Sequence, residues 1–278
     1  MSDQRTHYVT TSDGVTIGAT LHGQGPPLVF LQGVIGDGDL DWGPVAEHLS
    51  DRFTCHLPSM RGRGLSGDHP DLSVDRLVDD VITYVDSIGS SPGLVGWSLG
   101  AGLSLLVAAR CDAISAVAPL DPLAVSQMDE EERAALGGAV ARAGALAAEG
   151  DLAAAIRAFA EYPFNEKDIA VAEETGYFEA SARYVPDLLA FFGQMMEGDG
   201  GPPSDDPSVL GAISVPMLVL YGSDTTPFGE FSARHVSEHV ASARLHEIPG
   251  AGHTAPLTHP EELAETLAEF FASADQPA

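Results

Sequence analysis

Basic residues, and lysine in particular, are scarce in this chain of 278 residues. Lysine and arginine together number 13 against 41 aspartates and glutamates, lysine occurs once, at Lys167, and the formal net charge at pH 7 is -28. A surface of this charge repels phosphate groups, which argues against nucleic acids and anionic membranes as partners. The acidity itself is typical of a solvated, highly soluble surface.

Cysteines and long apolar runs are also few. Cys55 and Cys111 are the only cysteines, and they have no metal-site or redox spacing, so we expect two buried thiols. Residues 1–7 contain no apolar signal segment, and no uninterrupted apolar stretch reaches membrane-spanning length. We therefore expect a cytoplasmic protein. The histidines show no metal-ligand spacing either, and no metal site is expected.

What the chain does have is 44% apolar residues, enough for a sizeable core, and an alternation of strand and helix patterns. This alternation predicts an α/β fold with a mostly parallel central sheet flanked by helices. We expect strands at residues 8–11, 15–21, 27–31, 53–57, 114–119, 215–221 and 243–248, and helices at 42–49, 74–88, 101–110 and 260–271.

The alternation stops between residues 122 and 210, a segment rich in alanine and glutamate with no convincing strand. We interpret this segment as a helical cap inserted into a core made of residues 1–121 and 211–278. Three carboxylates follow Asp129 and suit the start of a helix. Further helices are expected at residues 152–162, 168–175 and 180–196.

The most informative motif is G-W-S-L-G at residues 96–100, between a short apolar run and a helical pattern. This placement predicts a serine nucleophile, Ser98, on a strand-to-helix elbow. The flanking glycines leave room for the sharp turn and its strained backbone.

A serine needs a histidine to take its proton and a carboxylate to orient that histidine. Asp224 follows the apolar strand at 215–221, and His253 lies in a glycine-rich loop after the strand at 243–248. We predict Ser98, Asp224 and His253 as the catalytic triad. Asp121, at the end of its own strand, is the alternative acid.

With these residues the sequence resembles the α/β-hydrolase superfamily over nearly its whole length. Four motifs carry the resemblance. They are the elbow, the G-A-G-H loop ending at His253, L-Q-G-V at residues 31–34, where the family has its oxyanion loop, and R-G-R-G-L-S at 61–66. The resemblance implies the α/β-hydrolase fold and an oxyanion hole made by the backbone N–H groups of Val34 and Leu99. It is greatest to small carboxylesterases and related biosynthetic and degradative hydrolases.

Two positions depart from the family pattern. Gln32 stands where the family has histidine, and we expect its amide to brace the oxyanion loop. Ser59 stands where an aspartate often occurs, which leaves Arg61 without one partner and predicts a less rigid segment.

The cap concentrates aromatic and methionine side chains, which suggests an apolar roof over the nucleophile. We expect the substrate-contacting residues to be Gln32, Trp97, Phe191 and Met195.

The predicted function is that of a serine hydrolase that cleaves an ester or related acyl bond of a small, largely apolar substrate through an acyl-enzyme, without a cofactor. Alternatives on the same residues are carbon–carbon bond hydrolysis, lactone opening, cofactor-free perhydrolysis and natural-product tailoring. A non-catalytic ligand-binding protein is a further alternative. The sequence leaves the choice between monomer and homodimer open.

Aspartates at positions 37, 39 and 41 have the alternation of a calcium loop. However, Trp42 and His48 stand at the sixth and twelfth loop positions, where such a loop has glycine and glutamate. We expect a solvated loop leading into a helix.

Overall fold

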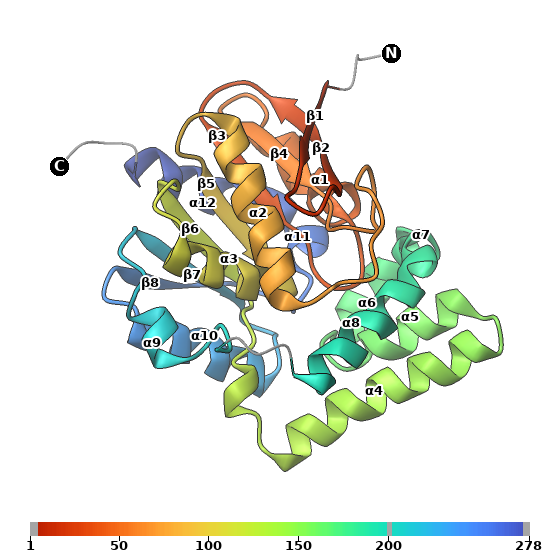
Figure 1. The fold of residues 1–278 in the computed structure, drawn as a ribbon. Helices are drawn as coiled ribbons and strands as arrows, with labels where there is room; N and C mark the ends of the chain where they lie inside the picture. The colour runs from red at the N-terminus through yellow and green to blue at the C-terminus, as the bar shows by residue number, and fades with distance from the viewer. Residues whose placement is uncertain (1–4, 199–201, 275–278) are drawn as a thin grey trace.

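The computed structural model describes residues 5–198 and 202–274. Eight strands form one sheet in the order β1-β2-β4-β3-β5-β6-β7-β8 (Figure 1). The pairs β1–β2 and β2–β4 are antiparallel and the other pairs are parallel. The strands are β1 (Arg5–Thr10), β2 (Thr16–Gly23), β3 (Pro27–Leu31), β4 (Thr54–Pro58), β5 (Gly93–Trp97), β6 (Ala116–Leu120), β7 (Met217–Gly222) and β8 (Ala243–Ile248).

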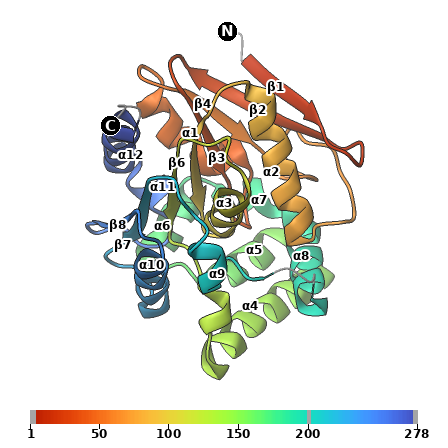
Figure 2. The same cartoon turned by 60° about the vertical axis from the view of Figure 1, so that its left-hand side comes forward.

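Helices cover both faces of this sheet. Helix α1 (Gly38–Leu49) packs against α12 (Pro260–Ala274) on one face, and α2 (Val74–Ile88) packs against α3 (Leu99–Arg110) on the other (Figures 1 and 2). The strands β5, β6 and β7 are buried along their whole length, as expected for apolar runs in a parallel sheet covered on both sides. The mostly parallel, helix-flanked sheet predicted from the sequence is confirmed.

The remaining helices of the core accompany the last strands. They are α9 (Pro207–Leu210), α10 (Pro227–His239) and α11 (Ala255–Thr258). Because β5, β6 and β7 are parallel neighbours, their carboxyl ends lie together. Each end is followed by a loop, and parallel α/β sheets bind ligands at this edge.

Between β6 and β7 the described chain contains helices and no strand. We call residues 130–197 the helical insert; its helices lie together beside the sheet (Figures 1 and 2). They are α4 (Glu130–Ala148), α5 (Leu152–Ala160), α6 (Glu166–Glu174), α7 (Tyr177–Ser181), the 3-10 helix η2 (Ala182–Tyr184) and α8 (Val185–Glu197), preceded by the 3-10 helix η1 (Val125–Gln127). The division into core and cap domains stays a prediction.

Two predicted helices differ from the structure by more than the shifts of a few residues seen at other helix ends. The helix expected at 180–196 is divided into α7, η2 and α8, and the last of these begins with Pro186 in its first turn. A proline fits that position because it lacks the N–H that would otherwise have no partner. Helix α1 begins at Gly38 rather than at Trp42, because Asp37 caps it by accepting the N–H of Leu40 at 2.9 Å.

The same start of α1 explains the aspartate alternation. Asp37 is the helix cap, Asp39 accepts the hydroxyl of Thr20 at 2.5 Å, and Asp41 is fully buried. The expectation of a solvated loop is therefore wrong. Within the described ranges, no group of three or more His, Cys, Asp or Glu side chains has the arrangement of a metal site.

The two thiols of Cys55 and Cys111 are free and buried, as predicted. A search of the described helices finds none that is both long and apolar enough to cross a membrane.

Candidate active site

Ser98 lies at the turn between β5 and α3. Its φ of 56° and ψ of -114° are unusual for a residue with a side chain. The turn is held by two backbone hydrogen bonds of 3.0 Å, from the N–H of Ser98 to the carbonyl of Leu120 and from the N–H of Ala101 to the carbonyl of Ser98. Such strain persists where the surrounding structure enforces it. The elbow predicted at residues 96–100 is present.

The two flanking glycines are required by close backbone contacts. A Cβ at Gly96 would overlap the carbonyl oxygen of Gly100, and a Cβ at Gly100 would overlap that of Leu31. Because these neighbours are backbone atoms, no side-chain rotation can relieve the overlap. The G-x-S-x-G spacing therefore follows from the packing of the elbow against the end of β3.

His253 lies in the loop after β8 and is paired with Asp121. Its Nδ1 is 2.6 Å from Oδ2 of Asp121, and the two side chains are 4% and 0% exposed. Asp121 follows β6 with a φ of 47°; it and Ser98 are the two non-glycine residues with positive φ in the part of the chain that the structure describes. Both strained residues thus belong to the same site.

Asp224, the predicted partner of His253, lies elsewhere, and this prediction is wrong. Its carboxylate is 39% exposed and forms an ion pair of 2.7 Å with Lys167 of α6. Its backbone carbonyl accepts the side-chain N–H of Asn165 at 3.1 Å. The next residue, Thr225, turns inward and donates its hydroxyl to Oδ2 of Asp121 at 2.8 Å. The turn after β7 therefore supports the acid on β6 and directs Asp224 outward to the insert.

The pairing with Asp121 fixes the chemistry of the imidazole. An ionised carboxylate only accepts hydrogen bonds, so we assign the proton to Nδ1 of His253, which leaves the lone pair on Nε2. His253 and Ser98 line the same cavity. Nε2 is then the atom that can accept the proton of the Ser98 hydroxyl.

Asp168 of the helical insert holds the His253 loop, which the sequence did not predict. Its carboxylate is 1% exposed and accepts the N–H of His253 at 3.0 Å and the hydroxyl of Thr254 at 2.5 Å. It also accepts the N–H of Asn165 in a capping box at the start of α6. The N-E-K-D pattern at 165–168 predicts the capping box, whereas the contact with the loop 85 residues away requires the fold.

A second set of contacts fixes the loop that contains Val34. Gln32 donates to the carbonyl of Gly36 at 2.6 Å and accepts the N–H of Met60 at 2.9 Å. The buried guanidinium of Arg63 donates to the carbonyls of Val34 and Gly36, both at 2.8 Å. Gln32 thus braces this loop, as expected, and Arg63 is a brace that sequence reasoning missed. Val34 and Leu99 both line the cavity beside Ser98.

Asp41 connects this loop to the helical insert. It accepts the N–H of Gly33 and the phenol hydroxyl of Tyr177 in α7, both at 2.8 Å. Burial raises the pKa of Asp41 to about 7, while the hydrogen bond from Tyr177 opposes this rise. Burial likewise raises the pKa of Tyr177 well above its usual value, with the neighbouring carboxylate as a further cause.

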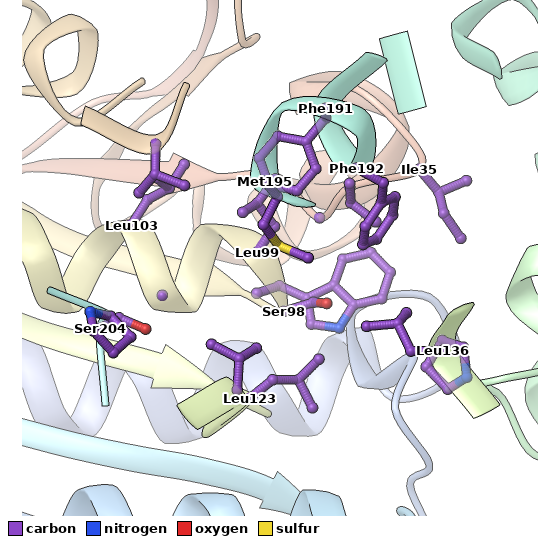
Figure 3. A pocket seen from close by; sticks show the side chains of 18 of the residues that line it. Ile35, Ser98, Leu99, Leu103, Leu123, Leu136, Phe191, Phe192, Met195 and Ser204 are labelled. Carbon is purple, nitrogen blue, oxygen red and sulfur yellow. The ribbon is translucent and has the colours of Figure 1, made fainter. Parts of the chain in front are cut away.

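The cavity at Ser98 has a volume of about 230 Å³ and mainly apolar walls. Phe191, Phe192 and Met195 of α8 lie on one side of Ser98 and Leu123 on the other (Figure 3).

Three of the four residues expected to contact substrate, Trp97, Phe191 and Met195, line this cavity. The fourth, Gln32, is 1% exposed and is not among the lining residues. Its prediction as a substrate contact is wrong because both ends of its amide are already paired, the nitrogen with Gly36 and the oxygen with Met60 after β4.

Trp97 has a second role beside the histidine. Its indole N–H donates to the carbonyl of His253 at 2.7 Å, and the two ring centroids are 5.7 Å apart. The residue before the nucleophile therefore both lines the cavity and holds the histidine.

The segment around Arg61 is more firmly held than expected from Ser59. The guanidinium of Arg61 is fully buried, pairs with both oxygens of Asp80 at 2.7 Å and lies 3.0 Å from the carboxylate of Asp13. The Ser59 hydroxyl accepts the N–H of Gly38 at 3.2 Å. Two carboxylates from other elements thus replace the one absent at position 59.

Comparisons with known proteins support the fold. The model of the alpha/beta hydrolase family matches residues 21–266. The pimeloyl-[acyl-carrier protein] methyl ester esterase of Chromobacterium violaceum is 28% identical over 256 residues, which cover 90% of this chain and 95% of that protein. The 2-(acetamidomethylene)succinate hydrolase of Mesorhizobium japonicum is 26% identical over 262 residues, with 92% of each chain covered. Among solved structures, an alpha/beta hydrolase from Sphaerobacter thermophilus has a TM-score of 0.73 and 29% identity, covering 95% of this chain and all of the other.

Proposed function

Since this chain belongs to the alpha/beta hydrolase family, we propose that it is a serine hydrolase that cleaves an ester or related acyl bond of a small, largely apolar substrate. The observation that carries the proposal is the 2.6 Å contact between His253 and Asp121 at the wall of the cavity that also contains Ser98. The relatives named above are hydrolases, and one is a methyl ester esterase.

In the proposed mechanism, Nε2 of His253 removes the proton of the Ser98 hydroxyl as the serine oxygen attacks the substrate carbonyl carbon. Asp121 stabilises the imidazolium that forms. The backbone N–H groups of Val34 and Leu99 donate hydrogen bonds to the developing oxyanion, each contributing about 3 kcal/mol to lowering the barrier.

The tetrahedral intermediate then collapses. The bond to the leaving oxygen breaks, His253 gives its proton to the departing alcohol, and the acyl group stays on Ser98 as an ester. Water enters and attacks the acyl carbon as it loses a proton to His253. The bond between the acyl carbon and the Ser98 oxygen then breaks, His253 returns the proton to Ser98, and the carboxylic acid leaves. Ser98 is half-buried at the cavity wall, whereas His253 is buried.

A non-catalytic binding protein would be favoured if the two departures from the family pattern, Gln32 and Ser59, left the neighbouring loops unsupported. Gln32 and Ser59 both have structural hydrogen bonds that support the neighbouring loops. No observation therefore favours the alternative over the hydrolase.

Turnover of p-nitrophenyl acetate and butyrate by the wild type and by Ser98→Ala tests the proposal. We expect saturable hydrolysis by the wild type and a loss of at least about 10³-fold in the variant. The variant Ser90→Ala is the matched control, because Ser90 is an exposed serine between α2 and β5 that does not line the cavity. Equal turnover by wild type and Ser98→Ala would contradict the proposal.

A further inference from the structure

One stripe of helix α3 faces the cavity along nearly the whole helix. The lining residues of α3 are Leu99, Gly102, Leu103, Leu106 and Arg110, and their spacing of three and four places them on one helix face. At 1.5 Å per residue, this stripe is roughly 16 Å long. The cavity of about 230 Å³ therefore extends along this face of α3 from Ser98 to Arg110.

The middle of the stripe is apolar and its far end is polar and open. Leu103 and Leu106 are each 2% exposed. At the far end Arg110 pairs with Asp75 at 2.7 Å, and their side chains are 34% and 48% exposed. Figure 3 shows Leu103 and Ser204 farther along α3 from Ser98. The groove therefore leads from the nucleophile along apolar side chains to solvent.

The position of His253 decides which part of an ester would enter this groove. The leaving alcohol takes its proton from His253, so it must lie on the histidine side of Ser98. On that side Phe164 of the helical insert lines the cavity, with its ring centroid 6.0 Å from the ring centroid of His253. The acyl part then extends in the other direction, along α3.

We infer that the groove along α3, lined by Leu99, Gly102, Leu103 and Leu106, binds the linear, uncharged aliphatic acyl chain of the substrate. This inference rests on the proposed serine-hydrolase function for its orientation. A linear chain fits an apolar groove that extends along one helix face, and an uncharged end suits a terminus where Arg110 is already paired with Asp75.

The length of the groove sets the preferred chain. With carbon–carbon bonds of about 1.5 Å, an extended chain advances roughly 1.25 Å per carbon. The apolar part from Ser98 to Leu106 spans about 12 Å and takes about eight to ten carbons. Because the far end is open, longer chains protrude into water, and the preference levels off rather than reversing.

The experiment compares kcat/KM for p-nitrophenyl esters from acetate to dodecanoate. Each methylene that leaves water contributes about two- to four-fold, so octanoate should exceed acetate by at least about 60-fold, with a plateau near decanoate. The variant Gly102→Leu places a side chain in the groove, where even a Cβ lies 3.2 Å from Oγ of Ser204. We expect its octanoate-to-acetate ratio to fall at least about ten-fold, and Gly102→Ala to give a smaller fall.

The matched control is Gly137→Leu, because Gly137 is an exposed helical glycine of α4 with open space around it. This control should keep the wild-type ratio. A flat chain-length profile, or the same ratio in Gly102→Leu and the control, would overturn the groove proposal.

A binding measurement separates this inference from the proposed function. Ligand-observed NMR of methyl octanoate with Ser98→Ala, with and without Gly102→Leu, needs no turnover. Binding that Gly102→Leu weakens supports the groove even where the wild type hydrolyses no ester, and that combination would refute the proposed function alone. Short-ester turnover together with octanoate binding that is insensitive to Gly102→Leu would refute the groove alone.

Discussion

Replacing Asp121 with asparagine should remove most of the activity, whereas the same change at Asp224 should not. In the structure Asp121 is fully buried and lies 2.6 Å from Nδ1 of His253, and Thr225 donates to the same oxygen at 2.8 Å. In Asp121→Asn the amide NH₂ can take the place of Oδ2, where it faces both the hydroxyl oxygen of Thr225 and Nδ1 of His253. A donor at this place favours the tautomer with the proton on Nε2, the atom that must accept the serine proton.

The size of the effect follows from the role of this hydrogen bond. An equivalent change in a serine protease lowers kcat by about 10⁴-fold, because the wrong tautomer leaves the geometry intact but removes the base. We expect a loss of about 10³- to 10⁴-fold in kcat for Asp121→Asn, corresponding to about 4 to 5.5 kcal/mol of barrier. For Asp224→Asn we expect less than about three-fold, since an exposed ion pair contributes roughly 0 to 1 kcal/mol.

The assay is the initial rate of p-nitrophenyl butyrate hydrolysis by the two variants, with thermal melting as the control for folding. The two asparagine variants are matched in chemistry and differ only in position. A large loss in Asp224→Asn with an active Asp121→Asn would refute the assignment of the acid.

Three further predictions concern contacts around the site. Asp168→Ala should lower kcat for p-nitrophenyl butyrate about ten-fold and lower the melting temperature, because the N–H of His253 and the hydroxyl of Thr254 lose a buried acceptor; wild-type kinetics and melting would contradict this. Burial raises the folded-state pKa of Asp41 to about 7. The folded protein therefore keeps this proton at pH values where the unfolded chain has lost it, and the free energy of unfolding falls as the pH rises from about 4 to 7. Denaturant titrations over this pH range should show that the free energy of unfolding falls less for Asp41→Asn than for the wild type. The same dependence of this free energy on pH in both proteins would count against the prediction. Because burial raises the pKa of Cys55 to about 12, this thiol should react with dithiobis(2-nitrobenzoate) only after unfolding. Rapid labelling of Cys55 in the native protein would contradict this prediction.

The sequence alone could not identify the carboxylate that pairs with His253. Asp121 and Asp224 each follow an apolar strand, so both satisfy the pattern of a functional carboxylate at the carboxyl end of a strand. The choice depends on the turns that follow. The backbone of Asp121 enters the left-handed region and directs its side chain inward, while Lys167 in the insert holds Asp224 outside. Neither feature has a local sequence signal.

The elbow and the central strands could be predicted because they depend on local patterns. The G-x-S-x-G spacing is needed by backbone contacts at Gly96 and Gly100, and α2 has the predicted boundaries. The braces of the two loops could not be predicted in this way. Arg63 contacts Gly36, 27 positions away, and Asp168 contacts His253, 85 positions away. Asp41 joins Gly33 to Tyr177, which is 136 positions away, so only the fold brings these groups together.

The most direct test of the account is intact-protein and peptide mass spectrometry after treatment with a small fluorophosphonate. An activated serine beside a neutral imidazole reacts with such a reagent, whereas an ordinary serine does not. The account predicts one adduct per chain, located on Ser98, absent in Ser98→Ala and formed much more slowly in Asp121→Asn. No adduct on the folded wild type, or an adduct that persists in Ser98→Ala, would contradict it.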